Sequence, residues 1–245
     1  MLIRSIALSL GALMMLNGCA DPELAKRVDD LETQITALEA QAKAGPAGGQ
    51  RRQAPAADPK AEQAARTMVE GIRSKINSLD WDGAKADCAK FASEFGGTQT
   101  FRGGNRYCEE AAVVGKDAKE LDVERWFQGE VSLSSGPTLL VFWETWCPHC
   151  RREVPKIEST YQNFKGKGLN VVGLTKVTRS ATDEGVAEFI KENNLTYPMA
   201  KEKGGNLSDH YGVRGVPAAA LVKDGKVVWR GHPGRLDEAL LNKML

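Results

Sequence analysis

The chain has 245 residues, of which 42% are hydrophobic and 27% are charged. This mixture is typical of globular proteins and excludes the collagen-like, wholly disordered and multi-span membrane classes. The 33 basic and 32 acidic residues give a formal net charge of +1. We therefore expect no nucleic-acid partner bound through overall charge.

Residues 1–18 have the features of a signal peptide. Arg4 precedes an uncharged run, 5–16, which is too short to span a bilayer comfortably and is typical of the apolar part of a secretory signal. The run ends in Leu16-Asn17-Gly18-Cys19, which resembles the lipobox of bacterial lipoproteins. The resemblance implies cleavage before Cys19 and a lipid on that cysteine. The alternative is an ordinary secretory signal with a chance cysteine.

A lipid on Cys19 would anchor the protein to a membrane of the bacterial cell envelope, facing the periplasm. The next residue is Ala20 rather than Asp, which by analogy with enteric sorting favours the outer membrane over the inner one.

The segment 19–43 carries a heptad pattern of apolar residues. β-branched residues at one core position and Leu at the other favour two parallel helices, so we expect a short coiled coil and a homodimer through residues 24–42. The alternative is a single amphipathic helix lying on another surface. The pattern consists of Leu24, Val28, Leu31, Ile35, Leu38 and Ala42. Residues 44–60 contain several Gly and Pro without an apolar period, which predicts a flexible linker.

Residues 61–118 predict a small all-helical domain. Apolar stripes cover 65–79 and 81–95, Gly96 and Gly97 end the second helix, and a third short helix is expected over 105–114. The pattern resembles a single tetratricopeptide-like hairpin.

Two of the five cysteines, Cys88 and Cys108, lie on successive predicted helices of this domain. Because lipid on Cys19 and a CxxC pair account for the other three, we expect Cys88 and Cys108 to form a structural disulfide. The bond would close a loop of about 20 residues and contribute about 3 kcal/mol. The alternatives are a second redox pair or two thiols in the core.

Residues 119–245 alternate predicted strands and helices in the order β-α-β-α-β-β-α. Near-continuous apolar runs predict buried strands at 138–143 and 169–174. Ser180 and Asp183 resemble a capping box for a helix that ends near Asn193. The dipeptide Asp224-Gly225 predicts a hairpin turn between strands. The remaining expected elements are a helix over 147–164, strands over 218–222 and 227–230, and a last helix over 235–245.

The chemistry is predicted at Trp146-Cys147-Pro148-His149-Cys150, where a strand gives way to a helix. Cysteines three residues apart on a first helical turn share a face, so their sulfurs can join. The helix N-terminus stabilises a thiolate at Cys147, which makes this residue the attacking nucleophile. Cys150 is expected to resolve the mixed disulfide, and Pro148 suits the first helical turn.

These residues resemble the thioredoxin superfamily, and more closely its TlpA-like branch of membrane-tethered thioredoxins. The resemblance covers about half of the chain and is carried by residues 142–150, Glu153, Pro155, Gly215-Val216-Pro217 and Asp224-Gly225. It implies a three-layer α/β fold, a cis peptide at Val216-Pro217 and a carboxylate, Glu153, that relays the proton of Cys150. A solvated helix face is the alternative for Glu153. We expect a substrate groove formed by Trp146, Pro148, His149, Val216 and Pro217.

We therefore predict a membrane-tethered thiol–disulfide oxidoreductase that needs no cofactor or metal beyond the Cys147–Cys150 disulfide. Its expected partners are cysteine-containing envelope or secreted proteins and a partner reductase or oxidase. The direction of electron flow stays open, because an imidazolium at His149 would stabilise the reduced form and a carboxylate at Glu144 would oppose it.

Other classes of function remain as alternatives. A zinc site would need a second ligand pair, copper(I) would need a histidine beside Cys147 and Cys150, and a peroxidase would not normally carry its nucleophile in a CxxC. The protein could instead be an envelope adaptor or scaffold lipoprotein whose thioredoxin-like domain is a redox sensor or binding module. Catalytic turnover distinguishes this adaptor from an enzyme.

Overall fold

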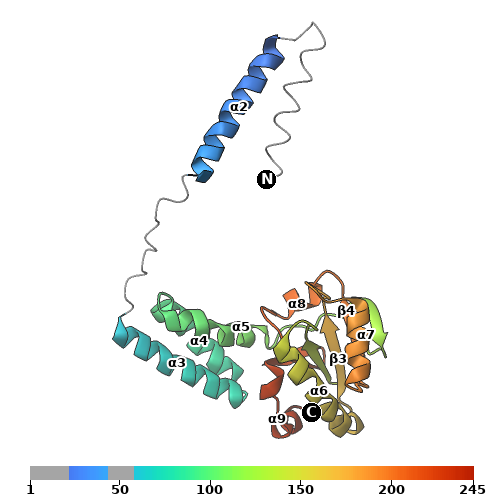
Figure 1. Cartoon of the computed structure of the whole chain (residues 1–245). Coiled ribbons are helices and arrows are strands. Elements are labelled where there is room, and N and C mark those ends of the chain that lie inside the picture. Colours follow the sequence, from blue (N-terminus) through green and yellow to red (C-terminus); the bar gives the residue numbers. More distant parts are fainter. Residues whose placement is uncertain (1–21, 44–57) are drawn as a thin grey trace. The chain divides into compact units, whose positions relative to one another are not determined.

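The computed structural model describes residues 22–43 and 58–245 (Figure 1). The chain divides into two compact units at Ala56 and Ala57, and each unit is described by itself. The predicted signal peptide, the lipid site at Cys19 and linker residues 44–57 lie outside the described residues. None of the helices within the described ranges has the length and apolar content that a bilayer crossing requires.

The first unit contains helix α2, Pro22–Lys43. Two residues of the predicted heptad seam, Leu31 and Ile35, are 56% and 55% exposed. An uncovered apolar seam is compatible with pairing to a second helix, and the coiled coil itself stays a prediction.

The second unit begins with three helices: α3 (Pro59–Asn77), α4 (Trp81–Phe95) and α5 (Gln99–Val113). Asp58 caps α3 by accepting a hydrogen bond from the N–H of Lys60, so this helix begins inside the predicted linker. The three helices share one hydrophobic core, whose fully covered members are Ala65, Ile72, Ile76, Ala84, Phe91 and Ala111.

Helix α5 begins at Gln99, six residues before the predicted start at Asn105. Its early start depends on α3, because the Glu62 carboxylate accepts hydrogen bonds from the N–H groups of Gln99 and Thr100. Gly104, which lies in the early part of α5, is required for packing: an added Cβ would lie 2.6 Å from Val69 and 3.2 Å from Phe91. The cap from Glu62 and the packing against neighbouring helices therefore outweigh the low helix propensity of glycine at this position.

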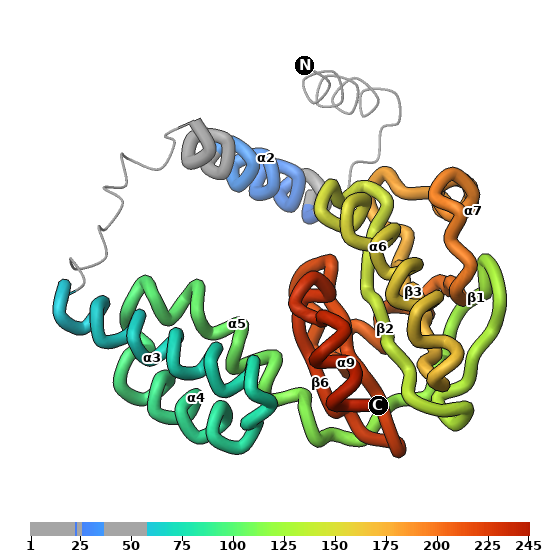
Figure 2. Tube along the Cα trace, turned by 90° about the horizontal axis from the view of Figure 1, so that it is seen from below, coloured from blue at the N-terminus to red at the C-terminus, as the bar shows by residue number. Residues whose placement is uncertain are grey.

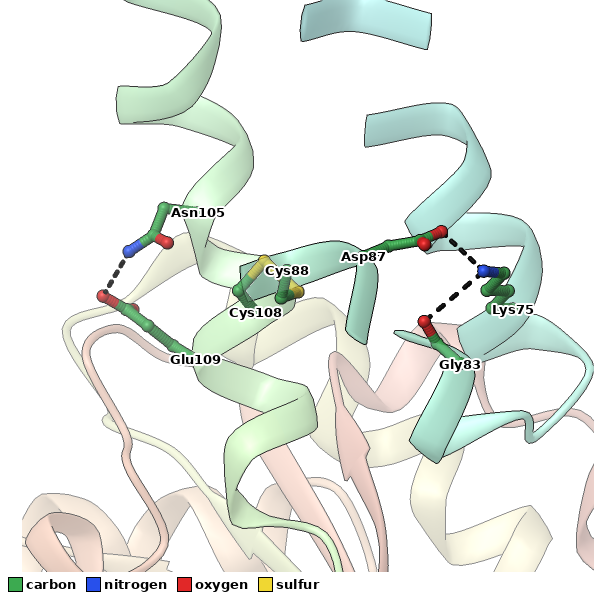
Figure 3. The surroundings of a disulfide bond; sticks show 7 residues. All are labelled: Lys75, Gly83, Asp87, Cys88, Asn105, Cys108 and Glu109. Atoms are coloured by element: carbon green, nitrogen blue, oxygen red, sulfur yellow. Dashed lines mark hydrogen bonds and ion pairs between the residues drawn. A yellow bond between two sulfur atoms is a disulfide. The ribbon is translucent and has the colours of Figure 1, made fainter. Parts of the chain in front are cut away.

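Cys88 of α4 and Cys108 of α5 form a disulfide, which Figure 3 shows between the two helices. On the other side of α4, Lys75 of α3 donates to Asp87 at 2.6 Å (Figure 3). The two contacts tie α4 to both of its neighbours.

The rest of the unit is built on a six-stranded sheet in the order β1-β4-β3-β2-β5-β6. Strands β2, β3 and β4 are parallel to one another, whereas β1 pairs antiparallel with β4, β5 with β2, and β6 with β5. The strands are β1 (Val123–Gln128), β2 (Thr138–Phe142), β3 (Asn170–Thr175), β4 (Met199–Glu202), β5 (Ala218–Lys223) and β6 (Lys226–Gly231). Two strands were not predicted from the sequence: β1, whose register is interrupted by bulges, and β4, which has 4 residues.

Helices cover both faces of this sheet, as a three-layer α/β fold requires. On one face α6 (Pro148–Phe164), α7 (Asp183–Glu192) and α9 (Glu238–Met244) pack on Leu139 and Val141 of β2. On the other face, α8 (Asn206–His210) and the end of α5 cover Leu140 and Phe142. Strand β2 is thus buried on both sides, which explains its continuous apolar run. Short 3-10 turns occupy Leu133–Ser135, Lys165–Lys167 and Pro233–Arg235.

Two further predicted helix starts, those of α7 and α9, were wrong. Helix α7 is capped by Thr182, whose side chain accepts from the N–H of Gly185, and not by Ser180. Both residue types cap helices well, and the one that directly precedes the first helical residue does so here. The last helix starts at Glu238 after a 3-10 turn, with Asp237 as its cap, rather than at Arg235.

The three-helix region lies beside β6, at the edge of the sheet (Figure 2). The segment after α5 continues along β6, with the N–H of Gly115 donating to Val227 and the N–H of Val227 donating to Lys116. An ion pair between Glu110 of α5 and Arg235 adds a second attachment. The two regions therefore have fixed relative positions within this unit.

Candidate active site

The two cysteines of the CxxC motif lie where β2 ends and α6 begins. Cys147 is the N-cap of α6, and its sulfur accepts a hydrogen bond from the backbone N–H of Cys150 at 3.3 Å. Both side chains are thiols and are nearly covered, with 4% and 0% of their surfaces exposed. The helix therefore presents its N-terminal N–H groups and dipole to the sulfur of Cys147, an arrangement that stabilises a thiolate.

The loop before β5 borders the same sulfur. The Cys147 thiol faces the carbonyl oxygen of Val216 at 3.5 Å, and the Val216-Pro217 peptide is cis. The side chain of Pro217 is buried, whereas Gly215 is exposed. Backbone groups of this loop are therefore next to the sulfur, where an extended polypeptide could pair with them.

Cys150 lies deeper than Cys147. Burial raises the pKa of its thiol strongly, and a hydrogen bond with Cys147 and the negative charge of Glu144 raise this pKa further. Cys150 must lose a proton before it can attack a disulfide, so this step is favoured by a nearby proton acceptor or a higher pH.

The structure places two glutamates near the motif in different surroundings. Glu144 is 4% exposed, and its carboxylate accepts hydrogen bonds from the N–H groups of Lys176 and Thr178 at 3.1 and 3.2 Å. Glu153, the predicted proton relay, forms an ion pair with Lys156 at 2.9 Å. The carboxylate that raises the pKa of Cys150 is that of Glu144.

The predicted groove residues around the cysteines are accessible to different degrees. The half-buried Trp146 donates from its indole nitrogen to the Thr178 hydroxyl at 3.2 Å, and the Arg179 guanidinium lies 3.8 Å from the centre of its ring. Pro148 and His149 are exposed. Trp146 is thus held as a fixed apolar edge beside Cys147.

The Nδ1 atom of His149 lies 2.7 Å from the Arg152 guanidinium. The effect of an imidazolium at His149 on the Cys147 thiolate stays a prediction.

Sequence reasoning missed Thr178 and Arg179, which hold Trp146 from the loop after β3. No local pattern marks them, because their contact with the motif arises from the parallel pairing of β2 and β3. Within residues 22–43 and 58–245, no cluster of at least three His, Cys, Asp or Glu side chains is suited to hold a metal ion.

Comparisons with known proteins agree with this geometry. The model of the AhpC/TSA family matches residues 114–230. The chain is 34% identical over 124 residues to thiol-disulfide oxidoreductase ResA of Bacillus thuringiensis subsp. konkukian (strain 97-27), a match that covers 49% of this chain and 70% of that protein. It is 31% identical over 87 residues to sporulation thiol-disulfide oxidoreductase A of Bacillus subtilis (strain 168), covering 36% of this chain and 53% of that one.

Among solved structures, the thioredoxin domain of a thiol-disulfide oxidoreductase from Bacteroides vulgatus aligns with a TM-score of 0.45 and 24% identity, over 54% of this chain and 94% of that one. The match to ResA extends over more than two thirds of that protein, and the family model falls on the half of the chain that holds the CxxC motif and the sheet. The chain therefore belongs, through its C-terminal half, to the thioredoxin-like thiol–disulfide oxidoreductases.

Proposed function

We propose that this protein exchanges disulfides with cysteine-containing proteins of the bacterial envelope through Cys147 and Cys150. One observation carries the proposal: the Cys147 sulfur caps a helix N-terminus and lies 3.5 Å from the carbonyl of a cis-proline loop. The helix favours the thiolate, and the loop offers backbone groups to a polypeptide next to it.

In the reducing direction, the Cys147 thiolate attacks one sulfur of a substrate disulfide. The substrate S–S bond breaks, one substrate sulfur leaves as a thiolate, and a mixed disulfide with Cys147 forms. The Cys150 thiolate then attacks the Cys147 sulfur and releases the second substrate thiolate. Two electrons have passed to the substrate, and the Cys147–Cys150 disulfide remains for a partner reductase to reduce. The oxidising direction reverses these steps and needs a partner oxidase.

Trp146, Pro148, His149, Val216 and Pro217 are the proposed substrate groove. Trp146 supplies an apolar edge, and the backbone at Val216 supplies polar groups for an extended chain. Glu153 stays a candidate for moving the proton of Cys150, and its ion pair with Lys156 would have to open for that role. The redox-active disulfide is the group that undergoes the chemistry, in place of an added cofactor.

The proposed site of action is the periplasmic side of an envelope membrane. The lipobox-like sequence ending at Cys19 supports a lipid anchor, and Ala20 favours the outer membrane. The exposed Leu31 and Ile35 of α2 support pairing through residues 24–42. A partner-binding role for a tetratricopeptide-like helical region stays a prediction.

The proposal is tested by turnover. The full chain should catalyse reduction of insulin disulfides by a small dithiol, and Cys147→Ser should abolish that catalysis while the far-UV circular dichroism spectrum stays the same. If the variant retains the full rate, the adaptor alternative is favoured instead.

The direction of electron flow is decided by the reduction potential of the Cys147–Cys150 couple. A value near about −270 mV would indicate a reductant and one near about −120 mV an oxidant. The potential can be measured by equilibrating the full chain with glutathione buffers and counting alkylated thiols.

A further inference from the structure

A cleft of about 440 Å³ lies beside the cis-proline loop, between helix α5 and the thioredoxin-like region. Its volume lies within the range of small-molecule and side-chain binding sites. Its lining includes Arg106 and Tyr107 from α5, Arg214 and Pro217 from the cis-proline loop, and Arg230 and His232 from β6 and the residue that follows it. Helix α5 lies outside the thioredoxin-like sheet, so the helical region completes this cleft.

Contacts across the boundary hold the cleft open in one shape. Arg235 pairs with Glu110 of α5, and its guanidinium also lies 5.6 Å from the centre of the Tyr107 ring. The segment after α5 is hydrogen-bonded along β6 through Gly115 and Val227. A preformed cleft loses less conformational entropy on binding than one that must be assembled.

The cleft has an excess of positive charge. Arg230 is 4% exposed, and backbone carbonyls, including that of Tyr211 at 2.8 Å, accept its hydrogen bonds. Burial lowers its pKa, but an arginine starts so high that it stays charged. Burial also lowers the pKa of His232, with Glu153 opposing, so this imidazole is mainly neutral at pH 7.

Two exposed arginines at the mouth lack an acidic partner. Arg106 donates to the phenol oxygen of Tyr107 at 3.0 Å, which leaves its charge uncompensated. Across residues 22–43 and 58–245, no carboxylate forms an ion pair with Arg106 or Arg214. Of the glutamates at the cleft, Glu110 is engaged by Arg235, and Glu109 is exposed and bound to Asn105.

The cleft is close to the reacting sulfur. Arg214 precedes Val216 by two residues, and the Val216 carbonyl is 3.5 Å from the Cys147 sulfur. Two residues span at most about 7 Å, and an extended substrate rises about 3.3 Å per residue. A substrate side chain about two to four residues from the attacked cysteine can therefore reach Arg214, and Arg106 lines the same cleft.

We propose that this cleft binds an acidic side chain of the substrate polypeptide, located about two to four residues from the target cysteine. The inference rests on the proposed exchange function and specifies its substrate class. Arg106 of the helical region and Arg214 of the cis-proline loop bind the carboxylate, as specificity-determining residues that do not touch the reacting sulfurs.

The test compares peptides that differ only in charge beside one cysteine, carried as a mixed disulfide with glutathione. One peptide has Glu and the other Lys at positions two to four from the cysteine. The reduced full chain should react faster with the Glu peptide, and Arg106→Glu combined with Arg214→Glu should lower the Glu-to-Lys rate ratio at least about fivefold. Lys90→Glu, a single charge reversal on α4 away from the cleft, should leave the ratio unchanged.

A second variant distinguishes an effect of charge from misfolding as the cause of a lower Glu-to-Lys ratio. Glu109→Gln removes a negative charge from the wall of the cleft and should raise the Glu-to-Lys ratio, which a damaged protein would not do. Equal rates for the two peptides, or an equal fall in Lys90→Glu, would overturn the acidic-residue inference and leave the exchange function standing. Failure to react with either peptide would overturn the exchange function and this inference together.

Discussion

The helical region and the thioredoxin-like region each hold two cysteines and use them in different ways. Cys88 and Cys108 extend from two helices that face each other, beside a shared core, and they are joined. Cys147 and Cys150 lie on the first turn of a single helix, next to a loop, and both are thiols. A bond across two packed helices closes a loop and restricts the unfolded chain, whereas a pair at a helix start is positioned to open and close.

The two regions also differ in how much apolar surface they bury. The sheet is covered on both faces, with aromatic side chains such as Trp143 and Phe164 fully buried. The helical core relies on small residues such as Ala65 and Ala84 around a single covered aromatic, Phe91. A small core leaves a narrow margin of stability, so the helical region depends more on its covalent link.

The largest effect is expected from Cys150→Ser. Without the resolving thiol, the mixed disulfide between Cys147 and a substrate should persist at least about a thousandfold longer, because the intramolecular attack is lost. Mass spectrometry of the full chain, after mixing with an oxidised peptide, should show the added peptide mass. Cys147→Ser is the matched control and should capture none. Rapid release by Cys150→Ser would mean that another thiol resolves the intermediate.

Removing the Cys88–Cys108 disulfide should change the stability of the helical region rather than the reactivity of Cys147. Cys88→Ala with Cys108→Ala should lower the free energy of opening of α4 and α5 by about 3 kcal/mol, since the disulfide closes a loop with a sequence separation of 20. Hydrogen exchange of the amides in α4 and α5 measures this directly. Amides of β2 and β3 should keep their protection, and alkylation of Cys147 should keep its rate. A uniform loss of protection would show that the two regions unfold together.

The same contrast explains what the sequence could predict. The boundaries of β2 and α6, the position of Cys147 at the helix start and the pairing partners Cys88 and Cys108 follow from local patterns and cysteine arithmetic. The start of α5 does not, because it depends on hydrogen bonds from Glu62 of another helix. Strands β1 and β4 are bulged or short, and their pairing is set by the rest of the sheet.

The candidate active site could likewise be predicted only where local patterns mark it. The CxxC motif and the cis-proline could be identified from the residues and the family resemblance. The burial of Glu144 against the loop after β3 could not, and neither could the presence of Arg106 and Arg214 in one cleft, since each joins segments far apart in the chain. Contacts between regions leave no periodic signal in either region.

A smaller effect on stability is expected when the ion pair between the helical region and the thioredoxin-like region is removed. Glu110→Gln removes the partner of Arg235 and a charge that favours the buried Arg230, so it should lower the free energy of unfolding by about 1–2 kcal/mol. Urea denaturation measures the change. Asp117→Asn, which breaks an exposed pair with Lys226, is the matched control and should leave stability nearly unchanged. Equal effects of the two variants would show that the attachment between α5 and the sheet carries little of the stability.

The smallest effect concerns how the buried thiol is activated. Burial, Cys147 and the charge of Glu144 all raise the pKa of Cys150, so below that pKa the rate at which Cys150 resolves a mixed disulfide should rise about tenfold per pH unit. Glu144→Gln removes the charge that disfavours the thiolate. The pKa of Cys150 should fall, and resolution at pH 7 should be about threefold to tenfold faster, with the pH profile displaced to lower pH.

Stopped-flow tryptophan fluorescence between pH 6 and about 9 follows this step, since Trp146 adjoins Cys147. Glu202→Gln is the matched control, because Glu202 is also buried but accepts its hydrogen bonds from Ser208 on α8. If both variants displace the profile equally, general loosening of the buried polar groups explains it. If Glu144→Gln slows resolution instead, the hydrogen bonds from Lys176 and Thr178 to Glu144 matter more for holding the motif in place than its charge does for the thiol. The redox site would then depend on fixed geometry in the way that the helical region depends on its disulfide.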